Sequence, residues 1–390
     1  MLHPGRVIAA LRAKAGRFAG YQVSVGDARR AYEGALEEVA KLTRADIEAR
    51  LAGIPSPGAR PTAEHDERGL IVPFSERWDN HEQARAWARE VLLGVPTVAV
   101  DGSQITPNKE ISLPVGAVQI GWFVNPHHAG EPYVKDVAFE VLAPDELADD
   151  GNGQSEDALG FPDRRVNARR FVQECQKLVA FVEAADKEAK PVCFFDGSFV
   201  ISFVQHMGPA LQREYVGAVT ALLAASEAHR VPVVGYVDGS YARDLVRMLR
   251  HVSAVDVEPA ISDGTLLAPR MRWGDRSAAY VCAREDAVER RYYERVGFAY
   301  LKTTAEGRPA RLDVPRWVVE EGELERVVDV VRAECVVGNG YPYALETADA
   351  VAVITQRDRE RFYRVLQGFA EREGLPLRFN AKGMSKRRRR

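Results

Sequence analysis

Apolar residues of this chain gather into short runs, and three of these runs end in the same polar signature. The three segments are 97–103, TVAVDGS, 192–198, VCFFDGS, and 233–240, VVGYVDGS. Short apolar runs bounded by turn signals are typical of buried strands. A single Asp-Gly is also an ordinary turn dipeptide. Three copies behind apolar runs predict carboxylates gathered at one edge of a sheet, with glycine allowing a sharp turn after each aspartate.

The spacing of apolar residues predicts the order of the neighbouring elements. After the first signature we expect strands at 113–124 and 133–142, a helix at 163–188, the second signature strand, a helix at 205–229, a strand at 231–237 and a helix at 241–251. Three consecutive strands predict an antiparallel meander, and the later strands, each reached through a helix, predict parallel pairing. The sheet is therefore expected to be mixed. This is the element order of the ribonuclease-H-like fold. We therefore expect an α/β protein with a ribonuclease-H-like mixed sheet flanked by helices, and Asp101 beside Asp196.

The rest of the pattern predicts three regions. Residues 1–60 predict an N-terminal helical region and a linker, because helical periodicity gives way to a stretch rich in proline and glycine. Residues 61–380 predict the main domain, and residues 381–390 a disordered basic tail. Acidic residues 143–163 predict a solvated loop. A C-terminal α+β extension follows, with strands at 278–284, 296–303 and 310–319 and helices at 321–335 and 356–373.

Composition restricts the class of protein. The chain has 390 residues, of which 46% are hydrophobic and 28% charged, and a net charge of -3, as in ordinary globular proteins. Its four cysteines are isolated, which indicates reduced core residues and argues against a disulfide framework or a zinc site. No apolar run approaches the roughly 20 residues that span a bilayer. We therefore expect a cytoplasmic protein without membrane contact.

Convergent carboxylates predict a divalent metal site. Carboxylates that share a site repel one another, and hard divalent cations prefer oxygen ligands. Glu174 lies at the edge of the apolar face of helix 163–188 and is a third candidate; the alternative is an ordinary surface pair with Arg170, four residues earlier. Two strand aspartates and a helix glutamate can hold two ions about 4 Å apart and hydrolyse a phosphodiester without a nucleophilic side chain.

The last third of the chain mixes basic and aromatic residues. Tyr300, Arg311, Arg316 and Trp317 lie on or beside the predicted strands. Such a mixture suits a groove that grips a nucleic-acid backbone and stacks bases, although solvated charges on a hairpin explain it equally well. The candidate nucleic-acid-binding residues are Arg243, Arg311, Arg316 and Trp317.

Several of these segments together resemble the NurA nucleases. The first two signatures, segment 235–237 and segment 340–345 follow one another in the family's order over residues 95–355. The resemblance implies a ribonuclease-H-like fold and a manganese-dependent nuclease, with magnesium as the alternative ion, that degrades DNA 5′ to 3′ and cuts single strands. It also implies a nucleoid-associated homodimer that acts with the hexameric HerA translocase in DNA end resection during double-strand break repair.

The resemblance assigns residues to the site. Asp101 and Asp196 match the two metal-binding aspartates, Glu174 matches the helix glutamate, and Tyr341 matches a tyrosine near the active site. Many members carry a histidine eight residues after this tyrosine, where the present chain has Asp349. An aspartate can bind a metal, so the expected catalytic and metal-binding set includes Asp349. It cannot serve as an imidazole acid near neutral pH, which puts the metal preference and the rate in question.

Two other functions fit part of the pattern. An ATPase of the actin and sugar-kinase type shares the core fold and places an Asp-Gly turn after its first strand, but the C-terminal half shows no Gly-Gly adenosine motif. A noncatalytic adaptor that holds DNA for a translocase is compatible with Asp349. ATP binding would distinguish the ATPase from a nuclease, and cleavage of labelled DNA with manganese would distinguish the adaptor.

Overall fold

The computed structural model describes residues 2–108, 111–147, 162–258, 260–285 and 292–378. The chain forms two compact units, and each is assembled from separate stretches of sequence. Of the described residues, unit 1 comprises 2–77, 237–258, 260–285 and 292–321. Unit 2 comprises 78–108, 111–147, 162–236 and 322–378.

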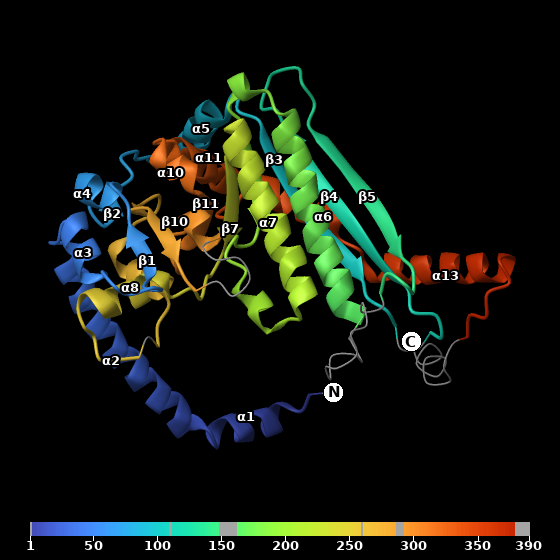
Figure 1. Cartoon of the computed structure of the whole chain (residues 1–390), viewed down its shortest axis with the longest axis horizontal. Coiled ribbons are helices and arrows are strands. Elements are labelled where there is room, and N and C mark those ends of the chain that lie inside the picture. The colour runs from blue at the N-terminus through green and yellow to red at the C-terminus, as the bar shows by residue number, and fades with distance from the viewer. Residues whose placement is uncertain (1, 109–110, 148–161, 259, 286–291, 379–390) are drawn as a thin grey trace. The chain divides into compact units, whose positions relative to one another are not determined.

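Unit 2 contains a mixed sheet in the order β5-β4-β3-β6-β7 (Figure 1). Its strands are β3 (Thr97–Ile105), β4 (Gly116–Asn125), β5 (Val134–Leu142), β6 (Val192–Asp196) and β7 (Val233–Val237). The strands β3, β4 and β5 form an antiparallel meander, whereas β6 runs parallel to β3 and β7 parallel to β6. The prediction of a ribonuclease-H-like α/β fold is confirmed.

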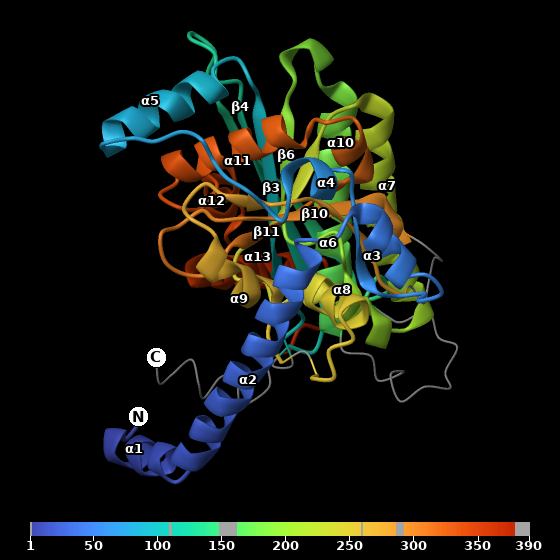
Figure 2. The same ribbon diagram turned by 90° about the vertical axis from the view of Figure 1, so that its left-hand side faces the viewer.

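Helices cover both faces of this sheet. The helices of unit 2 are α5 (His81–Leu92), α6 (Pro162–Ala184), α7 (Pro209–His229), α11 (Leu324–Val337), α12 (Tyr343–Ala352) and α13 (Gln356–Arg372). Figures 1 and 2 show α6 and α7 side by side on one face. The atoms that lie against two glycines of the sheet show which helix covers each face. A Cβ atom at Gly102 would meet Glu174 of α6, whereas a Cβ atom at Gly121 would lie 2.6 Å from the backbone nitrogen of Ala352 in α12.

Unit 1 combines helices from the N-terminal region with strands from two distant parts of the chain. Its strands are β1 (Gly58–Pro61), β2 (Ile71–Val72), β8 (Arg276–Ser277), β9 (Tyr280–Ala283), β10 (Val296–Leu301) and β11 (Ala310–Pro315). They pair antiparallel, in the order β1-β9-β10-β11, and β8 also pairs with β10 while β2 pairs with β8. Its helices are α1 (Pro4–Arg12), α2 (Ala15–Val39), α3 (Arg44–Arg50), α4 (Glu64–Arg68), α8 (Asp244–Val252), α9 (Asp263–Leu267) and α10 (Arg316–Glu320).

The structure does not divide the chain at residue 60. The segment predicted to be a linker contains β1, all four residues of which pair with β9. One face of the second half of α2 is buried, with Leu36 and Val39 fully inaccessible, and the hydroxyl of Tyr32 donates a hydrogen bond of 2.6 Å to the carbonyl of Val257. The predicted N-terminal appendage is therefore an integral part of unit 1. The predicted basic tail at 381–390 and most of the acidic loop, residues 148–161, lie outside the described residues.

Two expectations from composition can be compared with the structure. All four cysteines are buried and free. This agrees with the prediction of reduced core residues. Within the described part of the chain, no helix combines the length and the apolar character that crossing a bilayer requires.

Candidate active site

The two signature aspartates of unit 2 lie next to each other on neighbouring strands. Strands β3 and β6 pair in parallel, and Val100 with Phe195 is their last pair. Asp101 and Asp196 each follow directly, so both side chains project from the same face of the sheet, in register. Because β3 continues to pair with β4 as far as Ile105, Asp101 lies within a strand and not at its end. The structure thus brings these two carboxylates together.

Gly102 does not turn the chain, contrary to the prediction from its sequence. Of the three signature glycines, only Gly197 and Gly239 have positive φ angles, 140° and 62°. The role of Gly102 is to leave space. A Cβ atom there would overlap the Oε1 atom of Glu174 and lie 2.7 Å from the Cγ atom of Arg170. The close approach of α6 to β3 therefore requires a residue without a side chain at this position.

Glu174 is a buried carboxylate close to this pair. The guanidinium of Arg170, one turn earlier in α6, donates to Oε1 of Glu174 at 2.6 Å and to the carbonyl of Gly102 at 3.2 Å. The pKa of Glu174 is raised to about 8, chiefly by burial and also by the charges of Asp101 and Asp196, whereas Arg170 lowers it. Glu174 does pair with Arg170, but the carboxylate is only 3% exposed and does not lie on a solvated helix flank.

Helix α12 and the segment before it supply two further groups. Asp349 of α12 lies close enough to Asp101 to raise the pKa of its carboxyl group. The hydroxyl of Tyr341 donates a hydrogen bond of 3.2 Å to Oδ1 of Asp196. The ring of Tyr341 meets the ring of Tyr236 edge to face, with 5.1 Å between centroids. The structure therefore brings the five predicted catalytic residues into one region of unit 2.

Burial and mutual repulsion raise the pKa of both strand aspartates. Burial is the largest cause for Asp101, whose pKa reaches about 6; Asp196 and Asp349 add to the rise, and the N–H of Gly102, 2.7 Å from Oδ1, opposes it. The pKa of Asp196 is raised by burial and by Asp349, whereas the hydrogen bond from Tyr341 lowers it. Carboxylates that hold protons this tightly lack compensating positive charge, which a bound cation would supply.

The chemistry of these residues suits a hard divalent cation. Asp101, Glu174, Asp196 and Asp349 offer carboxylate oxygens, which are the preferred ligands of Mg²⁺ and similar ions. Within the described ranges, however, no group of three His, Cys, Asp or Glu side chains is arranged to hold an ion. In this arrangement Arg170 engages Glu174, and Tyr341 engages Asp196. Metal binding would therefore require these side chains to rotate toward one another.

Glu334 positions the segment that carries Tyr341 and Asp349, and sequence reasoning missed it. This carboxylate of α11 is 1% exposed. It accepts hydrogen bonds from the hydroxyl of Thr97 at 2.9 Å and from the N–H of Ala344 at 2.8 Å. It thereby ties the start of β3 to the first turn of α12. The available signal was an acid within the apolar helical run 327–335, because a buried acid needs partners.

Two of the predicted nucleic-acid-binding residues are buried inside unit 1. Arg311 is 1% exposed, and its guanidinium donates to Asp244 at 2.6 Å and to Asp313 at 2.7 Å. Trp317 is 5% exposed. Every residue of β10 and β11 is buried, so their charged side chains pair internally. Arg311 and Trp317 are therefore not available to grip DNA, and the alternative of solvated hairpin charges is also wrong for Arg311.

The other two predicted nucleic-acid-binding residues are on the surface of unit 1. Arg316 pairs with Glu320, four residues later in the sequence, at 2.6 Å. Arg243 is exposed at the N-terminal end of α8. Of the four candidate residues, only Arg243 and Arg316 are exposed enough to contact DNA.

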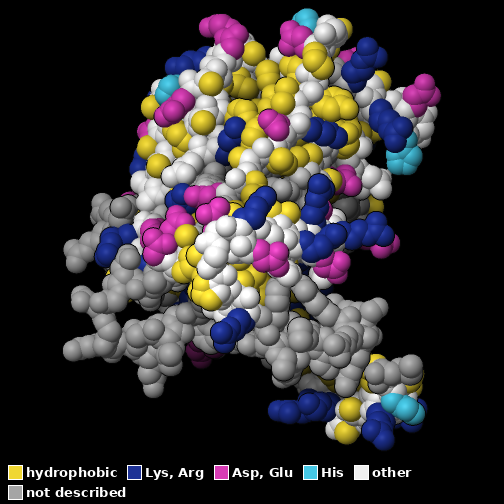
Figure 3. All heavy atoms as spheres, turned by 90° about the vertical axis from the view of Figure 1, so that its right-hand side faces the viewer, with side chains coloured by type: hydrophobic (Ala, Val, Ile, Leu, Met, Phe, Trp, Pro, Cys, Tyr) yellow, Lys and Arg dark blue, Asp and Glu magenta, His cyan; other side chains and the backbone are white. Residues whose placement is uncertain are grey.

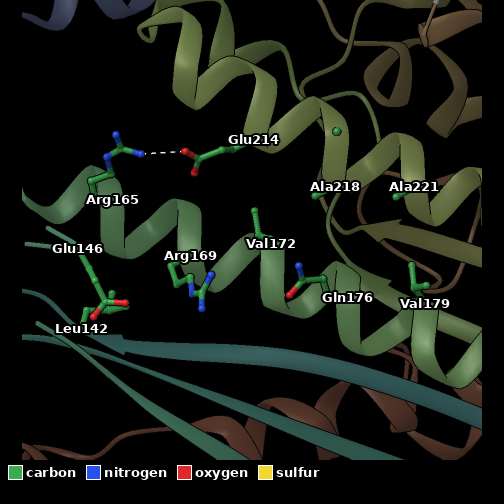
Figure 4. A pocket seen from close by; sticks show the side chains of 11 residues that line it. Leu142, Glu146, Arg165, Arg169, Val172, Gln176, Val179, Glu214, Ala218 and Ala221 are labelled. Carbon is green, nitrogen blue, oxygen red and sulfur yellow. Dashed lines mark hydrogen bonds and ion pairs between the residues drawn. The ribbon is translucent and has the colours of Figure 1, made fainter. Parts of the chain in front are cut away.

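A groove of about 540 Å³ lies elsewhere on unit 2, between α6 and α7 (Figure 4). The guanidinium of Arg165 reaches Glu214 across it at 2.8 Å. The groove is lined by Leu142, Glu146, Arg165, Arg169, Val172, Gln176, Val179, Glu214, Gly217, Ala218 and Ala221. The carboxylates of the candidate site are not among them.

We expect Gly102→Ala to destabilise unit 2. The added methyl group needs space that Glu174 and Arg170 occupy, and overpacking of this kind costs about 1–3 kcal/mol. Thermal unfolding followed by circular dichroism should show a lower Tm. Gly217→Ala is the matched control, because no atom lies within 4 Å of a Cβ there and alanine favours a helix by about 0.5–1 kcal/mol. An unchanged Tm for Gly102→Ala would contradict the close approach of α6 to β3 at this residue.

A model of the NurA domain matches residues 95–354. A crystal structure of NurA with manganese aligns over 91% of this chain and 98% of its own, with 10% identity and a TM-score of 0.46. No curated protein matches the chain.

Two endonuclease V structures are also similar. The catalytic domain of human endonuclease V aligns over 74% of this chain and 94% of its own, with 15% identity and a TM-score of 0.34. Endonuclease V of Ciona intestinalis, in complex with a DNA containing an inosine followed by a ribo-adenosine, aligns over 73% and 96%, with 11% identity and a TM-score of 0.29.

Proposed function

The chain belongs to the NurA family of nucleases, and from this premise we propose that it is a metal-dependent deoxyribonuclease that hydrolyses phosphodiesters. The observation that carries the proposal is the position of Asp101 and Asp196, in register on parallel strands and inside the matched region. Hydrolysis of a phosphodiester by bound metal ions needs acids that gather around positive charge, and these two acids raise each other's need for it, since the charge of Asp196 raises the pKa of Asp101.

We propose that Asp101, Glu174, Asp196 and Asp349 hold two divalent ions, Mn²⁺ or Mg²⁺. When bound, such ions lower the pKa of a water molecule and stabilise negative charge on the leaving oxygen. The protein contributes orientation. Tyr341 orients the carboxylate of Asp196 through its hydroxyl. Arg170 donates a hydrogen bond to the buried carboxylate of Glu174 and offsets part of the cost of its charge, although burial still holds the pKa at about 8.

The finer activity is proposed on the family resemblance. We propose that the protein degrades DNA 5′ to 3′, cuts single strands and acts with a HerA-type hexameric translocase in DNA end resection. Asp349 stands where many members carry histidine, so the site of this chain would offer one more oxygen ligand and one imidazole fewer. This favours ions that prefer oxygen over nitrogen.

A cleavage assay tests the proposal directly. DNA oligonucleotides labelled at the 5′ or the 3′ end are incubated with the protein, with Mn²⁺ or with EDTA, and ATP hydrolysis is measured in parallel. We expect short products from the 5′ end with Mn²⁺ and intact DNA with EDTA. Intact DNA under all conditions, together with DNA binding, would favour the DNA-holding adaptor. ATP turnover without cleavage would favour the ATPase.

We also propose that the protein forms a homodimer, as the family resemblance implies, and an exposed apolar face of β5 supports this. Val137, Phe139 and Val141 are 43%, 50% and 49% exposed, and β5 is the last strand in the order of described strands. The ring of Phe139 lies 6.2 Å from that of Phe362 in α13. The space-filling view shows apolar side chains gathered on this side of the molecule (Figure 3). Apolar edge strands are sites at which another chain can pair.

We expect Phe139→Glu to weaken the homodimer. A charge without a partner in an apolar interface costs several kcal/mol, so the molar mass by light scattering should fall toward that of the monomer at micromolar concentration. Phe18→Glu is the matched control, because Phe18 is a similarly exposed phenylalanine, 55%, in α2 of unit 1. Dimers that persist unchanged in Phe139→Glu would exclude this face as the interface.

A further inference from the structure

An exposed tyrosine with an arginine stacked behind it is a prominent surface feature of unit 1. Tyr241 is 80% exposed, the highest fraction among the large apolar side chains that the structure describes. The guanidinium carbon of Arg308 lies 4.7 Å from the centroid of its ring. The arginine supports the ring through a cation–π contact, and most of the remaining ring surface faces solvent.

The backbone that carries Tyr241 is held in place. Gly239 turns the chain after β7 with a φ angle of 62°. Ser240 is 8% exposed, and its hydroxyl accepts a hydrogen bond of 3.2 Å from the N–H of Ala242. The carbonyl of Ala242 accepts a bond of 2.9 Å from the N–H of Asp263 in α9. The aromatic ring therefore stands on a fixed base, although it has little side-chain packing of its own.

Arg308 is held in place as well. One terminal nitrogen of its guanidinium donates to the hydroxyl of Ser262 at 3.3 Å, and the other donates to the carbonyl of Gly239 at 3.3 Å. These two bonds fix the plane on which the ring of Tyr241 rests. A flat surface prepared in this way loses little conformational entropy when a second planar group stacks on it.

We propose that Tyr241 is a stacking platform for an unpaired DNA base, supported by Arg308, with the exposed guanidinium of Arg243 available to the adjoining phosphate. Proteins that bind single strands combine aromatic rings, on which bases stack, with basic groups that follow the backbone. The competing explanation is that the stack of Tyr241 on Arg308 only stabilises the turn. This inference rests on the proposed function, because it assumes a DNA substrate.

The first test measures DNA affinity without cleavage. In the full-length Asp101→Asn protein with EDTA, binding of a fluorescent oligothymidine is followed by anisotropy. We expect Tyr241→Ala to raise the Kd about 10-fold or more, since stacking on one ring is worth about 1–3 kcal/mol. Tyr241→Phe should keep the affinity, and duplex binding should change much less. Tyr21→Ala, which removes a 65% exposed tyrosine of α2, is the matched control and should have no effect.

The second test locates the base. An oligonucleotide that carries 5-iodouracil is cross-linked to the same protein by light, and the modified peptide is identified by mass spectrometry. We expect the adduct on Tyr241. A lower Tm for Tyr241→Ala with unchanged affinity, or adducts only on other aromatic residues, would overturn the inference and leave the nuclease proposal standing. Absence of DNA binding by the Asp101→Asn protein, and of cleavage by the wild type, would overturn both.

Discussion

Asp101→Asn is expected to lower the rate of DNA cleavage with Mn²⁺ by about 10³-fold, because it removes a charged oxygen ligand from the centre of the proposed site. The measurement is the initial rate on a labelled single strand. Asp136→Asn in β5 is the matched control. Each of the two aspartates accepts a hydrogen bond from the N–H of the following residue, at 2.7 Å for Asp101 and 2.8 Å for Asp136, but Asp136 is exposed. A rate close to that of wild type for Asp101→Asn would exclude its assigned role.

The same substitution is expected to stabilise the metal-free protein above neutral pH. The pKa of Asp101 is raised from 3.8 to about 6 on folding. A carboxyl group with a raised pKa contributes stability that is complete below its unfolded pKa and is lost as the pH rises through the folded one. At pH 8 the charged form therefore destabilises the fold, and asparagine removes this effect. The gain in Tm over wild type should be larger at pH 8 than at pH 4, and equal gains would contradict the argument.

Affinity for Mn²⁺ is expected to rise steeply with pH. Carboxylates must lose their protons to bind a metal, and the folded pKa values are about 6 for Asp101 and about 8 for Glu174. Each displaced proton changes the affinity by up to about tenfold per pH unit, so a rise of roughly 10–100-fold is expected between pH 6 and pH 8. Isothermal titration calorimetry measures it.

Two variants complete this experiment. Asp101→Asn should lose most of the metal affinity, whereas Asp136→Asn should bind Mn²⁺ as the wild type does. An affinity that does not change with pH would show that the raised pKa values belong to groups outside the metal site. Chelation by EDTA should abolish cleavage by the wild type altogether, since no side chain of the site is proposed to act as the nucleophile.

The core sheet of unit 2 could be predicted because its information is local. Apolar runs of strand length alternate with helical periodicity, and the order of these elements fixes which strands lie together. That order predicts β3 beside β6, and the structure adds the register, in which Val100 pairs with Phe195 and Asp101 lies beside Asp196. Glu174 was proposed as a site residue from its position at the edge of an apolar helix face, but the burial that raises its pKa could be seen only in the structure.

The features that were missed depend on contacts between distant residues. Arginine is usually found on the surface, yet Arg311 in β11 is buried, because Asp244 and Asp313 pair with its guanidinium. Gly102 belongs to an Asp-Gly dipeptide, which is typical of turns. Its φ angle is not positive, however, because β3 continues to pair with β4 beyond this residue. The segment around β1 has the proline and glycine of a linker, and its partner β9 lies more than 200 residues later. Sequence periodicity carries no signal for pairings of this kind.

The interleaving of the two units has a consequence for synthesis on the ribosome. Asp101 and Asp196 are translated before the second half of unit 1, whereas Tyr341 and Asp349 are translated after it. The N-terminal strand β1 must also wait for β9, and such late pairings slow folding. The proposed catalytic centre therefore cannot be completed until nearly the whole polypeptide has emerged, and a translation product that ends before residue 341 would lack both Tyr341 and Asp349, one of the four carboxylates of the proposed site.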